Sequence, residues 1–264
     1  SLDEGDLWFD TTNNIMKVYD ASNWVAAFAS LSGALALAGG TMTGNIVLGT
    51  NTVGGLQITT TATSNIGLGA NAVDSITTGD YNTGIGDTSL TANTEGNANT
   101  AVGYDTLTVN TTGSYNTAMG ITALDANTTG GYNTGIGYRA LTANTTASYN
   151  TALGYNTLEL NTTGADNVAV GRQALQANTT GANNTAVGAN ALDANTTGGS
   201  NTSFGGLSLS TNTTGSQNVA LGKNALFANT TASNNTAVGY NSLFTNTTGV
   251  DNVAVGKNAL DSQT

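Results

Sequence analysis

The residue types that most often do chemistry in proteins are nearly missing from this chain. It has no histidine and no cysteine, so it lacks the usual proton shuttle, the thiol nucleophile and the most common zinc ligands. A Ser-His-Asp triad cannot form without histidine. The 16 Asp and Glu residues never recur as a close pair at a fixed place in the chain. These features predict a protein that is not an enzyme and that has no metal site and no cofactor.

Charge is also scarce. Charged residues make up 8% of the 264-residue chain, whereas about a quarter is usual. The formal net charge is −11, and the cations are Lys17, Arg139, Arg172, Lys223 and Lys257. Nucleic acid is not an expected partner, because phosphate binding needs clustered Lys and Arg. Membrane insertion is not expected either, because no apolar run approaches the roughly 20 residues that a span requires.

A short repeat dominates the sequence. Glycine recurs every 17 residues from Gly69 to Gly256, with Asn four residues before it, and Leu four residues after it in all units but the first. The unit reads NTAVGANALDANTTGGS from Asn184 to Ser200, and we number its positions 1 to 17 from the Asn. The defining residues include Gly86, Gly103, Gly120 and Gly137 at position 5, Asn99 and Asn116 at position 1, and Leu107 and Leu124 at position 9. A fixed short period predicts a solenoid.

Within each unit, positions 2 and 4 and positions 9 and 11 keep the alternation of strands, so we expect two strands per coil. The sequence therefore predicts an all-β chain, a parallel β-solenoid or β-roll of about twelve 17-residue coils. The large apolar residues at positions 4 and 9 are expected to form the core. The small residues at positions 3 and 8 indicate close packing on the opposite side of the strands.

Backbone and amide chemistry add two expectations. The invariant glycine at position 5 should turn the chain with positive φ, whereas the position-15 glycine, replaced by Ala147 and Ala232, need not. The Asn rows at positions 1 and 12 should stack as amide ladders rather than bind a ligand.

A single 17-residue coil buries little apolar area, so we expect lateral association, most simply a three-fold trimer.

Positions 17 and 6 lie six residues apart at the two ends of the first strand, and they vary together. Tyrosines occupy many of these positions, namely Tyr115, Tyr132, Tyr149, Tyr138 and Tyr155. Asp166 and Asp251 instead accompany Arg172 and Lys257. These rows are either surface contacts to another molecule or cross-rung pairs of small energetic value.

The N-terminal part does not follow the 17-residue repeat, so the sequence divides into three regions. Residues 1–30 predict a β-hairpin around the turn formers Thr12, Asn13 and Asn14. Residues 31–64 form a connector rich in Gly, Ser and Thr with short strands, and residues 65–264 form the solenoid shaft.

Two families resemble parts of this chain. The N-T-A-V-G-Y-x-A-L units resemble the head repeats of trimeric autotransporter adhesins, which implies a left-handed parallel β-roll in a trimer. The segments GDLWFDTTNNIMKVYDASNW (Gly5 to Trp24) and GGTMTGNIVLG (Gly39 to Gly49) resemble parts of bacteriophage tail fibres. This second resemblance implies an extracellular virion protein, a homotrimer whose N-terminal side binds other tail or baseplate proteins and whose distal part contacts a host-surface glycan or protein.

Three hypotheses of function follow. The leading one is a structural tail-fibre shaft of a phage virion that contributes to host attachment. The second is the head domain of a bacterial trimeric surface adhesin. The third is an ice-binding β-solenoid, which requires a flat face of stacked threonines.

Overall fold

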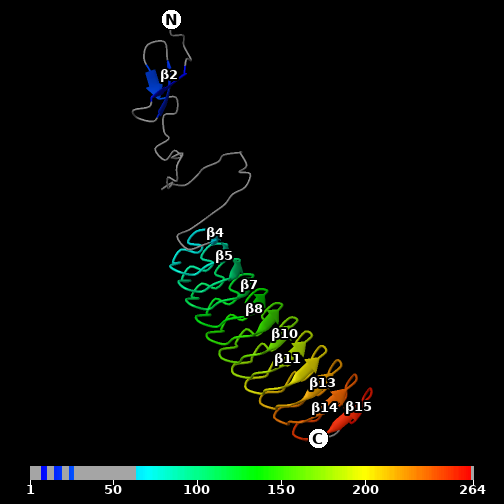
Figure 1. Ribbon diagram of the computed structural model, residues 1–264. Coiled ribbons are helices and arrows are strands. Elements are labelled where there is room, and N and C mark those ends of the chain that lie inside the picture. The colour runs from blue at the N-terminus through cyan, green and yellow to red at the C-terminus, as the bar shows by residue number, and fades with distance from the viewer. Residues whose placement is uncertain (1–6, 11–14, 20–23, 27–63, 263–264) are drawn as a thin grey trace. The chain divides into compact units, whose positions relative to one another are not determined.

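The computed structural model describes residues 7–10, 15–19, 24–26 and 64–262 (Figure 1). These residues belong to two separate compact units, a small N-terminal sheet and a solenoid. All regular structure in the described ranges is β-strand. Among these residues there is no helix that could cross a membrane.

The N-terminal sheet contains three antiparallel strands in the order β1 (Leu7–Asp10), β2 (Ile15–Tyr19) and β3 (Trp24–Ala26). Leu7 pairs with Val18 and Asp10 with Ile15. The predicted turn at Thr12 to Asn14 and the connector up to residue 63 lie outside the described residues.

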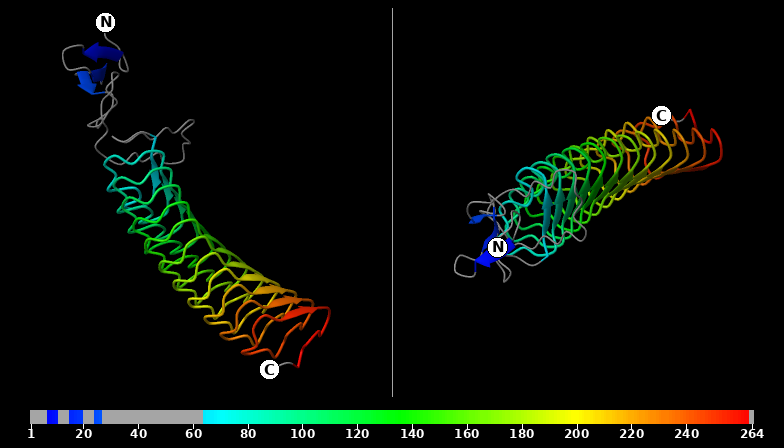
Figure 2. Two further views of the ribbon diagram at one scale, coloured as in Figure 1. Left: turned by 60° about the horizontal axis from the view of Figure 1, so that its bottom comes forward. Right: turned by 90° about the horizontal axis from the view of Figure 1, so that it is seen from above.

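The solenoid is built on one twelve-stranded parallel sheet whose strands follow each other in chain order (Figures 1 and 2). Each strand residue pairs with the residue 17 positions later in the next strand, as Thr100 does with Thr117. This arrangement confirms the predicted parallel β-solenoid. Its strands are β4 (Ile66–Leu68), β5 (Thr83–Ile85), β6 (Thr100–Val102), β7 (Thr117–Met119), β8 (Thr134–Ile136), β9 (Thr151–Leu153), β10 (Val168–Val170), β11 (Thr185–Val187), β12 (Thr202–Phe204), β13 (Val219–Leu221), β14 (Thr236–Val238) and β15 (Val253–Val255).

Each described coil contributes one strand, at positions 2 to 4, so the prediction of two strands per coil is wrong. The second segment fails to form a strand because its backbone is left-handed at positions 7 and 9, as at Thr122 (φ 55) and Leu124 (φ 54). It is still bonded to the next coil. Leu124 N donates to Ala140 O at 3.0 Å and Ala126 N to Thr142 O at 3.2 Å.

The core contains the leucines of position 9 and the small residues of positions 3 and 8. From Leu90 to Leu243 every position-9 leucine is fully buried. The expectation that position 4 belongs to the core is wrong, because Met119 is 45% exposed and Phe204 52%. The interior is too narrow for two large rows: even a Cβ on Gly135 at position 3 would lie 3.4 Å from Cγ and Cδ1 of Leu124, in contact with the leucine row. Position 3 is therefore small because it points inward, and the alternation of the strand turns position 4 outward.

The corrected core predicts a contrast between two leucines of one coil. Replacing the fully buried Leu158 by alanine should lower the free energy of unfolding by about 2–5 kcal/mol, because it leaves a cavity. Replacing Leu160, which is 47% exposed, should cost less than about 1 kcal/mol. Chemical denaturation measures both. Equal losses would contradict this assignment of the core.

Candidate functional site

The Asn row at position 1 forms a buried amide ladder. Asn150 N donates to Asn133 Oδ1 at 3.0 Å, and Asn150 Nδ2 donates to Gly164 O at 2.9 Å. Asn150 Oδ1 accepts from Asn167 N at 3.0 Å and from Asn167 Nδ2 at 3.1 Å. All three asparagines are fully buried. The ladder confirms the structural interpretation of this row, since its amides are paired and not accessible to a ligand.

The Asn-Thr-Thr-Gly segment makes a second and a third ladder. Asn144 at position 12 donates from Nδ2 to Asn127 Oδ1 at 2.9 Å and to Ala147 O at 3.0 Å. At position 13, Thr145 Oγ1 donates to Thr162 O of the next coil at 3.2 Å. The threonine ladder was not predicted, although the recurrence of threonine at position 13 of every unit was visible in the sequence. The segment therefore ties each coil to its neighbours.

The position-5 glycines have positive φ throughout, between 121° at Gly120 and 142° at Gly205, which confirms their predicted role in turning the chain. The position-15 glycines are not in this region, in agreement with the alanines that replace two of them. The repeat glycine therefore marks a backbone turn.

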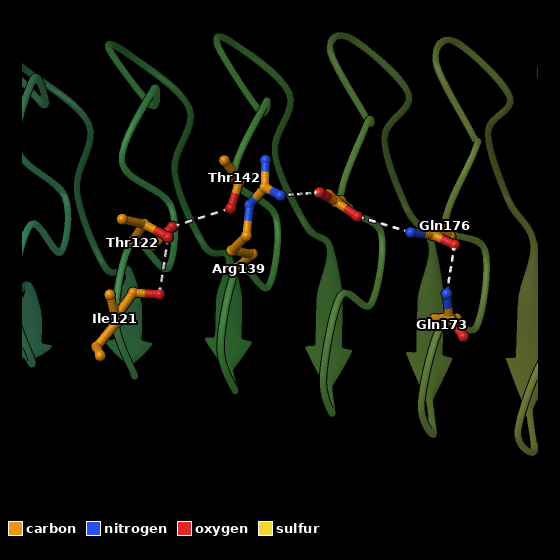
Figure 3. Close-up of polar contacts among 7 residues, drawn as sticks. Ile121, Thr122, Arg139, Thr142, Gln173 and Gln176 are labelled. Atoms are coloured by element: carbon orange, nitrogen blue, oxygen red, sulfur yellow. Dashed lines mark hydrogen bonds and ion pairs between the residues drawn. The ribbon is translucent and has the colours of Figure 1, made fainter.

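A row of polar side chains follows positions 7 and 10 along the solenoid (Figure 3). Arg139 Nη1 lies 2.8 Å from Glu159 Oε1, and Gln176 Nε2 donates to Glu159 Oε2 at 2.7 Å. Gln173 Nε2 in turn donates to Gln176 Oε1 at 3.0 Å. The Glu159 side chain is only 8% exposed, but both of its oxygens are paired. This network joins three consecutive coils and leaves no free carboxylate on Glu159.

Asp125 lies in the same row and is less well satisfied. Its Oδ1 is buried and accepts no hydrogen bond. Burial raises the pKa of this carboxyl, and the charge of Asp105 raises it further, while Arg139 and two backbone amides lower it. In the described residues no three His, Cys, Asp or Glu side chains gather as metal ligands would.

The raised pKa of Asp125 predicts that replacing this carboxylate by a neutral side chain stabilises the fold, by an amount that depends on pH. Its folded pKa lies above the ordinary value of 3.8, so this group stabilises the fold less as the pH rises through the raised pKa. Asp125→Asn should therefore raise the thermal unfolding temperature at neutral pH. The gain should vanish below pH 3.8, where the carboxyl is protonated in both states. A gain that is the same at both pH values would contradict a pKa origin.

The tyrosines of positions 17 and 6 stack along the solenoid. Ring centroids lie 4.8 Å apart for Tyr115 and Tyr132, 5.1 Å for Tyr132 and Tyr149, and 5.4 Å for Tyr138 and Tyr155. All five rings are exposed. Since their faces contact one another within each row, the edges and hydroxyl groups are what a partner would meet. Cross-rung stacking and contact with another molecule are thus compatible roles.

Between these two rows lies a surface that we call the outer sheet face, made by positions 2 and 4 of β4 to β15. It contains no charged residue in any coil. Position 2 is Thr, Val or Ile, and position 4 is apolar throughout: Leu68, Ile85, Val102, Met119, Ile136, Leu153, Val170, Val187, Phe204, Leu221, Val238 and Val255. A continuous apolar stripe of this length is unusual on a monomer.

The fold makes this chain a β-solenoid repeat protein. No family model, curated protein or solved structure matches it.

Proposed function

We propose that this chain is a structural protein of a phage virion and that its solenoid is a segment of a tail-fibre shaft. The resemblance of Gly5–Trp24 and Gly39–Gly49 to tail-fibre segments supports the phage assignment. The observation that carries the structural role is the unbroken stack of twelve strands, tied rung to rung by buried asparagines. At about 4.8 Å per rung the sheet extends about 55 Å.

The proposed partners are copies of the same chain, most simply in a homotrimer. The outer sheet face supports self-association, because it is uncharged and its position-4 row is apolar and continuous over every coil. In this proposal the N-terminal side binds tail or baseplate proteins, and the exposed rows contact a host-surface glycan or protein. The chain would act outside the cell, on the virion.

Threonine geometry argues against the ice-binding hypothesis. The position-13 hydroxyls already donate to carbonyls of the next coil, as Thr162 Oγ1 does to Thr179 O at 3.0 Å. The position-2 threonines share their face with side chains as different in size as Val187 and Phe204. Such a surface is not flat.

Immunoelectron microscopy tests the proposal. Antibodies raised against the solenoid should label tail appendages of virions from a culture that carries this gene. Virions that lack the chain should adsorb to host cells more slowly. Labelling of the bacterial envelope in place of virions would contradict the proposal and support the surface-adhesin alternative, while unchanged adsorption would remove the attachment role.

A further inference from the structure

Two exposed rows border the outer sheet face, one at each end of its strands. The first is position 17, just before each strand, and the second is position 6, just after the glycine turn. Pairing each position-17 residue with the position-6 residue six places later gives Tyr81 and Asp87, Ala98 and Tyr104, Tyr115 and Ile121, Tyr132 and Tyr138, Tyr149 and Tyr155, Asp166 and Arg172, Asn183 and Ala189, Ser200 and Gly206, Gln217 and Lys223, Asn234 and Tyr240, and Asp251 and Lys257. We call these edge pairs.

Six of the eleven edge pairs match in chemical kind. The four consecutive pairs from Ala98 and Tyr104 to Tyr149 and Tyr155 join aromatic or aliphatic residues, and two pairs farther along join opposite charges, whereas Tyr81 with Asp87 and Asn234 with Tyr240 do not match. Asp166 and Asp251 are the only charged residues at position 17, and each is level with a basic residue at position 6. The charged pairs set the height: shifted by one rung, Asp166 would face Tyr155 and Asp251 would face Tyr240, so opposite charges meet at equal height.

Contact within one chain does not explain this match. The two members of a pair stand at opposite ends of a strand, up to about 20 Å apart along six residues. Arg172 donates to Gln173 Oε1 at 2.7 Å and to Asn190 Oδ1 at 2.8 Å, and among the described residues no ion pair joins it to Asp166. The tyrosine stacks run along each row and not across the sheet. The complementarity thus has no use inside the monomer.

We propose that three copies of this chain associate in parallel and in register, with the position-6 row of each copy against the position-17 row of the next. The outer sheet faces then point to a common axis parallel to the solenoid. In such a ring all strands run in one rotational sense, so the end of each strand meets the start of the next. The contact is heterologous and closes after three copies. This inference rests on the self-association in the proposed function and specifies its register.

The dimensions of the outer sheet face fit this arrangement. Three walls about 20 Å wide enclose a triangle whose sides lie about 6 Å from the axis, near half the ~10 Å spacing of packed sheets. One layer of position-2 and position-4 side chains fills that space, whereas four copies would leave a hole. Each copy would contribute about 1,100 Å² divided between two neighbours, so each pairwise contact buries about 1,100 Å² in total, just above the roughly 1,000 Å² expected of a specific interface. Tyrosine-rich, charge-poor surfaces are typical of such contacts.

Disulfide trapping in the full-length chain tests the register. The chain has no cysteine, so Tyr149→Cys and Tyr155→Cys can be introduced together without other thiols. A disulfide needs Cα atoms within about 7 Å, so this pair can close only if the two rows of neighbouring copies meet at the same rung. Mild oxidation should yield covalent trimers on a denaturing gel, and reduction should remove them.

The matched control is Tyr115→Cys with Tyr155→Cys, which removes the same side-chain types but sets the thiols two rungs, about 10 Å, apart. This variant should stay monomeric on the gel, as should each single substitution. Asp251→Cys with Lys257→Cys repeats the test at the far end of the rod, should the tyrosine variant fail to fold.

Each outcome decides a different claim. Covalent trimers from the matched pairs alone support the inference. Sedimentation at trimer mass without matched cross-links, cross-links from the offset pair, or covalent dimers as the final product would overturn the register while leaving the proposed fibre role intact. Sedimentation at the single-chain mass of 26.3 kDa would overturn self-association as well. Virion labelling tests the fibre role separately.

Discussion

Replacing Asn150 by alanine is expected to lower the free energy of unfolding by about 2–4 kcal/mol. The substitution leaves the backbone N–H of the fully buried Asn167 without its acceptor, which costs about 1–3 kcal/mol because this group cannot reach water. It also removes one of the two side-chain donors to Gly164 O, which keeps its hydrogen bond from Asn161 Nδ2 at 2.9 Å. This second loss should cost about 0.5–1.5 kcal/mol.

Asn234→Ala is the matched control. This asparagine is exposed at position 17, and its left-handed backbone (φ 62) should make alanine cost about 1 kcal/mol. Denaturant titration followed by circular dichroism compares the two variants. Equal destabilisation would show that the buried ladder contributes no more than a surface asparagine.

The defect should also be local. A solenoid coil contacts only its neighbours, so its stability is close to a sum of coil and interface terms. In Asn150→Ala, hydrogen exchange should accelerate first in the coils around β9 and β10, and the distant strands β5 and β14 should be protected longer. Uniform acceleration along the whole sheet would contradict nearest-neighbour coupling.

The sequence located the coils correctly because the features that repeat are those that contact their own copies. An asparagine that hydrogen-bonds to the asparagine 17 residues later must be kept in every unit, and so must a glycine with φ above 120°. Period, amide ladders and turn glycine could therefore be predicted from residue identity and spacing alone.

The same pattern does not predict which side of each strand faces the core. Alternation places Ala152 and Leu153 on opposite faces but does not say which face is inside. The larger residue is the natural choice for a core. In this solenoid the buried Leu158 already occupies the interior, and only a small residue fits opposite it, so Leu153 is outside. The result is the apolar outer sheet face.

The left-handed backbone conformation at position 9 could not be predicted from the sequence either. Leu107, Leu124 and the other leucines of this row adopt φ near 50°, a conformation that costs an L-residue roughly 1–2 kcal/mol. Glycine would be the local choice. Leucine is present because its burial in the core compensates for the strain, a tertiary effect that no local propensity contains.

Replacing Gly171 by alanine is expected to destabilise the solenoid by about 3 kcal/mol or more, for two reasons that act together. Its φ of +127° lies where residues with a side chain are strained. A Cβ at this position would also lie 2.7 Å from Gly188 O and 2.8 Å from Gly188 C in the next coil. Since those atoms are backbone, relief requires a shift of one coil against its neighbour.

Gly164→Ala makes the same chemical change in the preceding turn and separates conformation from crowding. Position 15 is also tightly packed, but its backbone is not left-handed, and Ala147 and Ala232 occupy it naturally. Alanine at residue 164 should therefore cost less than about 1 kcal/mol. Thermal unfolding of both variants provides the comparison. If Gly164→Ala were as damaging as Gly171→Ala, crowding alone would explain the repeat glycine, and its positive φ would not be the reason that it recurs every 17 residues.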